Sequence, residues 1–213
     1  MRSQTEFGNE AFQDPIAMIV VKVGGSLFDL PDLGSRLAAW LRSLKNPDVL
    51  LVPGGGVSAD AVRTLDRVHG LGEECSHWLS LEVLALNARF LGHVLDGGVV
   101  VDDLPGAGKS WRLRKLPVLN AYLFACADER QAGRLPHCWE VTSDSVAARV
   151  AAVSGARRLI LLKSIALPVG MSWDAAACAG LVDVYFPRAL AALASATASD
   201  CSVEVVNLRE WKQ

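Results

Sequence analysis

Two short, continuous apolar runs near the start of the chain each end in a cluster of glycines. Residues 17–23 read AMIVVKV and run into Gly24-Gly25, and residues 48–52 read DVLLV and run into PGGG. Runs of this length, rich in Val, Ile and Leu, predict strands that are buried on both faces. Between them, apolar residues recur at helical spacing over 33–44. The order strand, glycine loop, helix, strand predicts a parallel sheet with helical crossovers.

The rest of the chain keeps the same α/β rhythm, and no linker or fixed-period repeat interrupts it. We therefore expect one three-layer αβα domain with a mainly parallel central sheet over residues 17–213, preceded by a flexible N-terminal extension, residues 1–16. The segment DDLPGAGKSWRLRK at 102–115 is rich in Gly, Pro and basic residues, which predicts a loop over a site or a sheet edge. The further expected helices are 57–68, 75–95, 144–153, 173–179 and 187–194, and the further strands are 99–101, 116–119, 158–162 and 203–206.

The predicted helix over 75–95 carries a broad apolar face. Its main stripe is widened on one side by two further leucines, and the whole face is wider than one core contact requires. This width predicts a homodimer or a higher homo-oligomer. The stripe consists of Leu79, Val83, Leu86 and Phe90, and the widening residues are Leu84 and Leu91.

The composition narrows the class of ligand. Hydrophobic residues make up 51% of the 213 residues, and the formal net charge of -2 provides no basic field for nucleic acid or an anionic membrane. The N-terminus lacks the basic start and apolar stretch of a secretory signal, and no window is apolar enough to span a membrane. The five cysteines are odd in number and form no C-x-x-C pair, so free thiols in a cytoplasmic protein are expected. A small anionic metabolite fits these features best.

The glycine clusters are the first candidate phosphate sites. Ligands of parallel α/β sheets bind outside the carboxyl ends of the strands, where glycine amides and helix N-termini attract anions. Gly24-Gly25 and Gly54-Gly55-Gly56 both stand at such ends, although either cluster alone could simply form a tight turn. The pair together favours phosphate binding.

Three charged residues stand beside these strand ends. Lys22 lies within an otherwise apolar strand, Lys163 ends the apolar run RLILL, and Asp144 begins a predicted helix. Phosphoryl transfer depends on positioning and on neutralising charge, which lysines can supply. The segment 142–145, TSDS, would also be explained by helix capping alone, so the sequence leaves both interpretations of Asp144 open.

The basic residues of 102–115 are weaker candidates. The run GAGKS at 106–110 ends like a Walker loop, but the required first glycine is replaced by Asp103. Lys109 could contact a phosphate or simply lie in solvent. We nevertheless expect substrate contacts from Lys109, Arg112 and Arg114.

Four motifs together resemble the amino-acid kinase superfamily in order and spacing: VKVGGS at 21–26, VPGGG at 52–56, TSDSVA at 142–147 and LLKS at 161–164. The resemblance implies an ATP-dependent kinase that uses Mg²⁺, in which Lys22 bridges the transferring phosphoryl group and Asp144 orients the lysines. It also implies that the glycine loops, with Ser26 and Ser143, bind the nucleotide and phosphate groups.

The chain departs from the larger members of that superfamily after Lys163, where the usual D-G-[IV] turn and a later lysine-bearing glycine segment are missing. Its shortness and the run LPHCWEVTSDS at 135–145 resemble the small branch that contains the methanofuran-biosynthesis kinase, which converts an aminomethyl-furanmethanol phosphate to its diphosphate. The implied acceptor is then a small phosphorylated metabolite. A UMP or isopentenyl phosphate kinase, and a nucleotide-binding storage or sensor protein without turnover, remain as alternatives.

Overall fold

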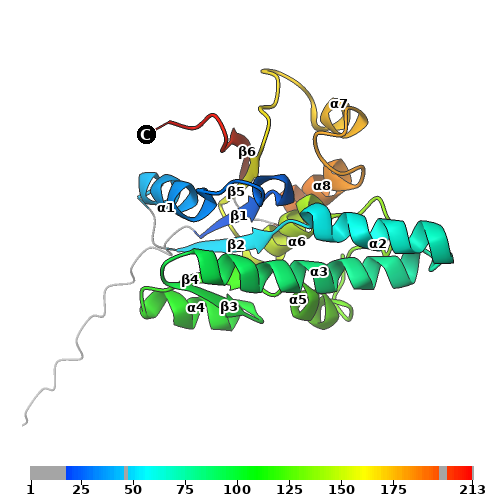
Figure 1. The fold of residues 1–213 in the computed structure, drawn as a ribbon, viewed down its shortest axis with the longest axis horizontal. Helices are drawn as coiled ribbons and strands as arrows, with labels where there is room; N and C mark the ends of the chain where they lie inside the picture. Colours follow the sequence, from blue (N-terminus) through cyan, green and yellow to red (C-terminus); the bar gives the residue numbers. More distant parts are fainter. Residues whose placement is uncertain (1–17, 46–47, 197–200, 213) are drawn as a thin grey trace, which may run out of the picture.

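The computed structural model describes residues 18–45, 48–196 and 201–212, which form a six-stranded sheet with helices on both faces (Figure 1). The expected extension, 1–16, lies outside these residues. The strand order is β3-β4-β2-β1-β5-β6, and every pairing is parallel, so the predicted fold class is confirmed. The strands are β1 (Ile19–Val23), β2 (Val49–Pro53), β3 (Gly98–Val101), β4 (Leu116–Leu119), β5 (Arg158–Lys163) and β6 (Ser202–Asn207).

The central strands explain why their sequences are continuously apolar. Every residue of β1 and β2 is buried, because helices cover both faces of the sheet. Side chains of β1 alternate between two core clusters, with Val21 on one face and Val20 on the other. Lys22 follows the alternation of Val20 and therefore lies on the face that packs against α6 (Ser143–Ser154).

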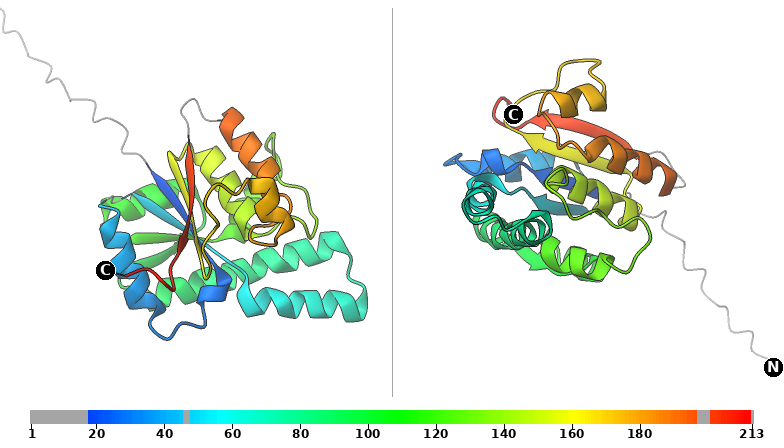
Figure 2. Two further views of the ribbon diagram at one scale, coloured as in Figure 1. Left: turned by 90° about the horizontal axis from the view of Figure 1, so that it is seen from above. Right: turned by 90° about the vertical axis from the view of Figure 1, so that its right-hand side faces the viewer.

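Helices divide between the two faces in the same way. The Val21 face packs against α1 (Leu33–Ser43) and the C-terminal half of α3 (Glu73–Val94), whereas the Val20 face packs against α6 and α8 (Phe186–Ala196). A further helix, α2 (Gly56–His69), begins where β2 ends and pairs with α3, and the two extend together beyond the sheet (Figure 2). This arrangement leaves the starts of α2 and α6 at the carboxyl edge of the strands.

The expectation of a loop over 102–115 is wrong, because residues Leu104–Arg112 form helix α4. The carboxylate of Asp103 accepts a hydrogen bond from the Gly106 amide at 2.6 Å, and Pro105 occupies the first turn, where its missing N–H costs nothing. Ala107 lies on the inner face of α4 and is fully buried in the core. Capping and packing thus outweigh the low helix propensity of the two glycines. Two more short helices are α5 (Ala121–Asp128), which the sequence pattern did not predict, and α7 (Trp173–Cys178).

The apolar face of α3 divides into an inner and an outer part. Leu84 and Leu91 are buried against the core, whereas Leu86 and Phe90 are 56% and 37% exposed. The expected stripe through Leu86 and Phe90 is therefore the outer face of the helix, and self-association through it remains a prediction. Within the described part of the chain, no helix has the length and apolar character needed to cross a bilayer.

Candidate active site

Two lysines and one aspartate meet at the carboxyl edge of the sheet. Lys22 and Lys163 come from the ends of the adjacent strands β1 and β5, and Asp144 comes from the first turn of α6. Lys22 Nζ lies 2.9 Å from Asp144 Oδ1, and Lys163 Nζ donates to Asp144 Oδ2 at 2.6 Å. One carboxylate thus bridges two ammonium groups, and the structure brings together the three residues predicted as catalytic.

The electrostatics of this cluster follow from its burial. Burial alone would raise the pKa of Asp144, but the neighbouring charges of Lys22 and Lys163 outweigh it and hold that pKa below its ordinary value. Burial and the charge of Lys22 lower the pKa of Lys163, while Asp144 opposes the change. The carboxylate therefore stays ionised and keeps two mutually repelling cations in one small volume.

Asp144 does not act as the cap of α6. The amides of Thr142 and Ser145 donate instead to Asp183 Oδ2, at 3.1 and 2.9 Å, and both hydroxyl groups donate to the same carboxylate. Asp183 is buried, and its pKa is raised by burial and by the charge of Asp144. The geometry therefore rules out the capping interpretation of Asp144, and its catalytic role remains a prediction. It also adds Asp183, which lies too far along the sequence for any local pattern to have identified.

The glycine clusters pack directly against each other. A Cβ on Gly25 would lie 2.0 Å from the Gly56 amide nitrogen, so only glycine allows this contact. Gly56 also has a positive φ of 57°, at the start of α2. Asn87 of α3 donates from Nδ2 to the carbonyls of Gly54 and Gly55 at 2.7 and 2.9 Å, which fixes the second loop from behind. Gly55 and Gly56, at the start of α2, line the same cavity as Lys22 and Lys163.

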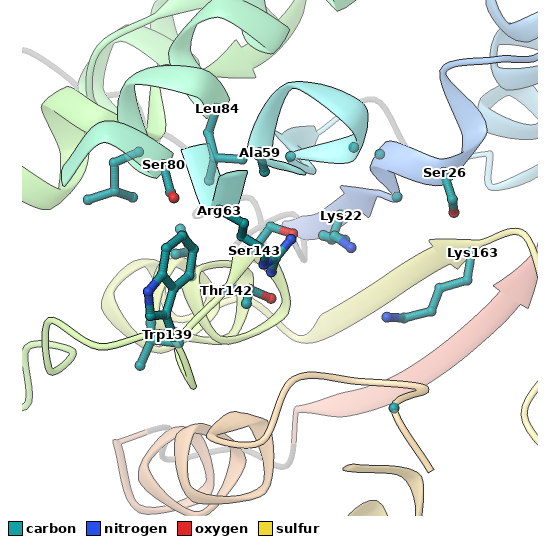
Figure 3. Close-up of a pocket in the computed structure, with 18 of the residues that line it drawn as sticks. Lys22, Ser26, Ala59, Arg63, Ser80, Leu84, Trp139, Thr142, Ser143 and Lys163 are labelled. Carbon is teal, nitrogen blue, oxygen red and sulfur yellow. The ribbon is translucent and has the colours of Figure 1, made fainter. Parts of the chain in front are cut away.

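A cavity of about 450 Å³ opens between these elements (Figure 3), a size typical of small-molecule sites. Asp144 stands behind its lysines rather than on the cavity surface, and Gly54 is likewise absent from the lining. The hydroxyl groups of Ser26 and Ser164 are 3.0 Å apart at one side of the cavity. The predicted site residues that line the cavity are Lys22, Gly24, Gly25, Ser26, Gly55, Gly56, Ser143 and Lys163.

The basic residues predicted to bind substrate are not part of this cavity. Lys109 and Arg112 belong to α4, and Arg114 follows it. The end of α4 lies near the amino edge of the sheet, since Trp111 Nε1 donates to the carbonyl of Val49, the first residue of β2. The structure therefore separates these three residues from the lysine and Asp144 cluster.

The cavity is also lined by a cation that sequence reasoning missed. Arg63 of α2 lines the cavity together with Trp139, and its Cζ lies 5.3 Å from the centroid of the Trp139 ring. Arg63 stands in an ordinary polar helix pattern, so nothing in the local sequence distinguishes it from a surface arginine.

Comparison with known proteins supplies the context for this geometry. Residues 17–166 match the amino acid kinase family. The chain belongs to this family. The expected resemblance is thus confirmed, and because kinases are phosphotransferases, phosphoryl transfer is the class of reaction that the site has to explain.

Individual relatives are distant. The [5-(aminomethyl)furan-3-yl]methyl phosphate kinase of Methanocaldococcus jannaschii is 24% identical over 152 residues, which cover 70% of this chain and 66% of that relative. Among solved structures, UMP kinase from Ureaplasma parvum superimposes with a TM-score of 0.62 at 14% identity over 91% of both chains. Uridylate kinase from Archaeoglobus fulgidus gives a TM-score of 0.57 at 15% identity over 89% of this chain and 100% of its own. These two likenesses establish the fold.

Proposed function

We propose that this protein transfers the γ-phosphoryl group of MgATP to a small metabolite that already carries a phosphate. The observation that carries the proposal is the pair of lysines bridged by the buried Asp144 carboxylate beside two interlocked glycine loops. A purely binding protein needs positive charge, but it does not need two ammonium groups fixed by one carboxylate. Catalysis of phosphoryl transfer gains from this arrangement, because its rate depends on charges positioned in advance.

Each residue then has a distinct role. Lys22 and Lys163 neutralise the charge on the transferring phosphoryl group, and Asp144 keeps both ammonium groups in place despite their repulsion. The amides at the start of α2 and of the Gly24-Gly25 loop face the ATP phosphates, where a helix N-terminus favours negative charge.

Magnesium would be carried by the nucleotide. Both oxygens of Asp144 are engaged by lysines, and the described residues contain no cluster of three or more acidic, His or Cys side chains that could hold a metal. Mg²⁺ is commonly held by substrate phosphates with few protein ligands, so the residues present are compatible with MgATP. The ion would offset phosphate charge alongside Lys22 and Lys163.

The acceptor would lie toward the Arg63 end of the cavity. Arg63 is a cation separate from the lysine cluster, and a guanidinium group suits a phosphate monoester. The name of the methanogen relative supports a furanmethanol phosphate as the acceptor, with a diphosphate as the product. Arg63 would hold the acceptor's phosphate while an oxygen of that phosphate attacks the γ-phosphorus of ATP and ADP leaves.

A panel of acceptors tests the proposal. ADP release would be measured with furan-3-ylmethyl phosphate, its 5-aminomethyl derivative, UMP and isopentenyl phosphate, and with each unphosphorylated alcohol as a matched control. We expect turnover with a phosphorylated furan and none with the alcohols. Turnover with UMP alone would assign the activity suggested by the uridylate kinase fold neighbours, and ATP binding without ADP release on any acceptor would favour a storage or sensor protein.

A further inference from the structure

The segment between α5 and α6 is fixed although it has little regular structure. His137 lies between two carboxylates, with Nδ1 2.8 Å from Glu74 Oε2 and Nε2 2.8 Å from Glu129 Oε1. Its ring also stacks on that of His77, with centroids 5.0 Å apart. Burial alone would lower the pKa of His137, but Glu129 and Glu74 outweigh it and raise that pKa. These contacts tie the segment to the start of α3 and the end of α5.

Trp139 lies two residues after His137 and is held by a separate hydrogen bond. Its Nε1 donates to Asp66 Oδ2 at 2.8 Å, and Asp66 Oδ1 accepts a hydrogen bond from the Gly72 amide at 3.0 Å. Asp66 therefore joins the end of α2, the turn into α3 and the indole. The orientation of the Trp139 ring is set by α2, the helix that also carries Arg63.

Arg63 is the group on which this orientation acts. The side chain of Arg63 is 46% exposed, and its ion pair with Asp60 on the same helix is also exposed, so that pair holds it weakly. The face of Trp139, 5.3 Å from Cζ, restricts where the guanidinium group can lie. Figure 3 shows Arg63 and Trp139 among the residues that line the cavity, together with Lys22.

We infer that Trp139, held by Asp66, is a positioning residue that fixes Arg63 as the anchor for the phosphate of the acceptor. The inference rests on the proposed function, since it assigns the acceptor to this wall of the cavity. The anchor suits a phosphate monoester whose organic part is small and apolar, because Leu84 and Val146 line the same cavity of about 450 Å³. The lysine cluster then acts on the transferring phosphoryl group and Arg63 on its acceptor.

A wall with a purely structural role would behave differently. In that case the loss of Trp139 would lower the stability of the protein and would weaken the binding of ATP and of the acceptor alike. If Trp139 acts through Arg63, loss of Trp139 should weaken binding of the acceptor selectively. The same loss should have little further effect on acceptor binding once Arg63 is absent.

A double-mutant cycle with a phosphate ester as probe separates these possibilities. Calorimetry would measure the Kd of furan-3-ylmethyl phosphate in the presence of a saturating non-hydrolysable ATP analogue, for the wild type, Arg63→Ala, Trp139→Ala and the double variant. We expect Trp139→Ala to raise the Kd of the probe roughly fivefold to thirtyfold, which is the scale of a cation–π contact in a partly desolvated site. Trp139→Phe should recover part of this loss, because its ring still offers a face to Arg63.

The control is Trp111→Phe, which also removes an indole hydrogen bond but at the amino edge of the sheet. It should leave the Kd of the probe and the KM for ATP within twofold of the wild type. In turnover assays Trp139→Ala should raise the KM for the acceptor while kcat and the KM for ATP change less than threefold.

The outcomes distinguish the inference from the proposed function. Additive losses from Arg63→Ala and Trp139→Ala, or equal losses for the probe and for the ATP analogue, would overturn the positioning role alone. A wild-type protein that binds the probe but releases no ADP with any acceptor would contradict the kinase function alone. A wild-type protein that does not bind the probe, yet turns over a non-phosphorylated acceptor, would contradict both.

Discussion

Replacement of Asp144 by Asn tests the bridging carboxylate. The substitution keeps the shape of the side chain and removes the charge that lies 2.9 and 2.6 Å from two ammonium groups. Removing one partner of a buried ion pair costs about 3–5 kcal/mol. Both lysines line an open cavity, so we expect the lower end of that range and a fall in Tm of about 6–12 °C for a chain of this size.

The effect on catalysis should be much larger than this loss of stability implies. Without the carboxylate, Lys22 and Lys163 repel each other and leave the positions that the transition state requires. Loss of one preorganised electrostatic donor typically lowers kcat about 10²–10³-fold, and two donors are disturbed here. We therefore expect kcat to fall at least a hundredfold while the KM for ATP changes little.

The assay is ADP release at least 15 °C below the lower Tm, so that both proteins are folded. Asp128→Asn is a matched control, since Asp128 is buried and accepts two hydrogen bonds from Arg149, both at 2.7 Å, away from the lysines. This control should lose comparable stability but retain kcat within about threefold, as expected for sites without shared partners. A normal kcat in Asp144→Asn, or an equal fall in both variants, would refute the reasoning.

Three further predictions follow from the same geometry. Lys22→Ala should lower kcat by on the order of a hundredfold, with a fall in Tm no larger than that of Asp144→Asn because the carboxylate keeps its contact with Lys163, and a near-normal rate would remove Lys22 from the mechanism. Asp183→Asn should move the alkaline limb of the kcat/KM profile to lower pH, because the Asp183 charge raises the pKa of Lys163 against the burial that lowers it. The control Ser145→Ala removes one hydrogen bond but no charge, so it should leave the alkaline limb in place. An unmoved alkaline limb in Asp183→Asn would contradict this coupling. Light scattering at micromolar concentration should give a mass of at least twice the 22.8 kDa of one chain, because Leu86 and Phe90 leave an apolar face of α3 exposed, and a single monomeric species would exclude self-association through this helix.

The parts of the molecule that the sequence predicts well are those in which local pattern and burial agree. β1, β2 and β5 are short apolar runs, and their buried positions in the sheet require that composition. Lys22 and Lys163 were identifiable because a charge at the end of a buried strand needs a specific reason. Helix α4 was missed because the cap by Asp103 outweighed the presence of two glycines and a proline.

The remaining features depend on contacts between distant segments. Asp183 receives its hydrogen bonds from residues 38 and 41 positions earlier, and Trp139 meets Asp66 across 73 positions. Asp183, Trp139 and Asp66 each lie in a stretch of ordinary composition, so the periodicity of the sequence does not indicate their roles. Arg63 can be recognised as a candidate binding residue only from its contact with Trp139 in the folded chain. The meeting of charged residues at the strand ends was therefore predictable, whereas the wall assigned here to the acceptor was not.

Phosphorus NMR of the complete reaction is the most direct test of the central claim, that the site of Lys22, Asp144 and Lys163 transfers a phosphoryl group. MgATP, the protein and a furanmethanol phosphate would be followed together, with Lys22→Ala in a parallel sample. The prediction is that ADP and a diphosphate ester of the acceptor appear in equal amounts with the wild-type protein, and at least a hundredfold more slowly with the variant. Release of inorganic phosphate without a new ester, or equal rates in the two samples, would contradict it.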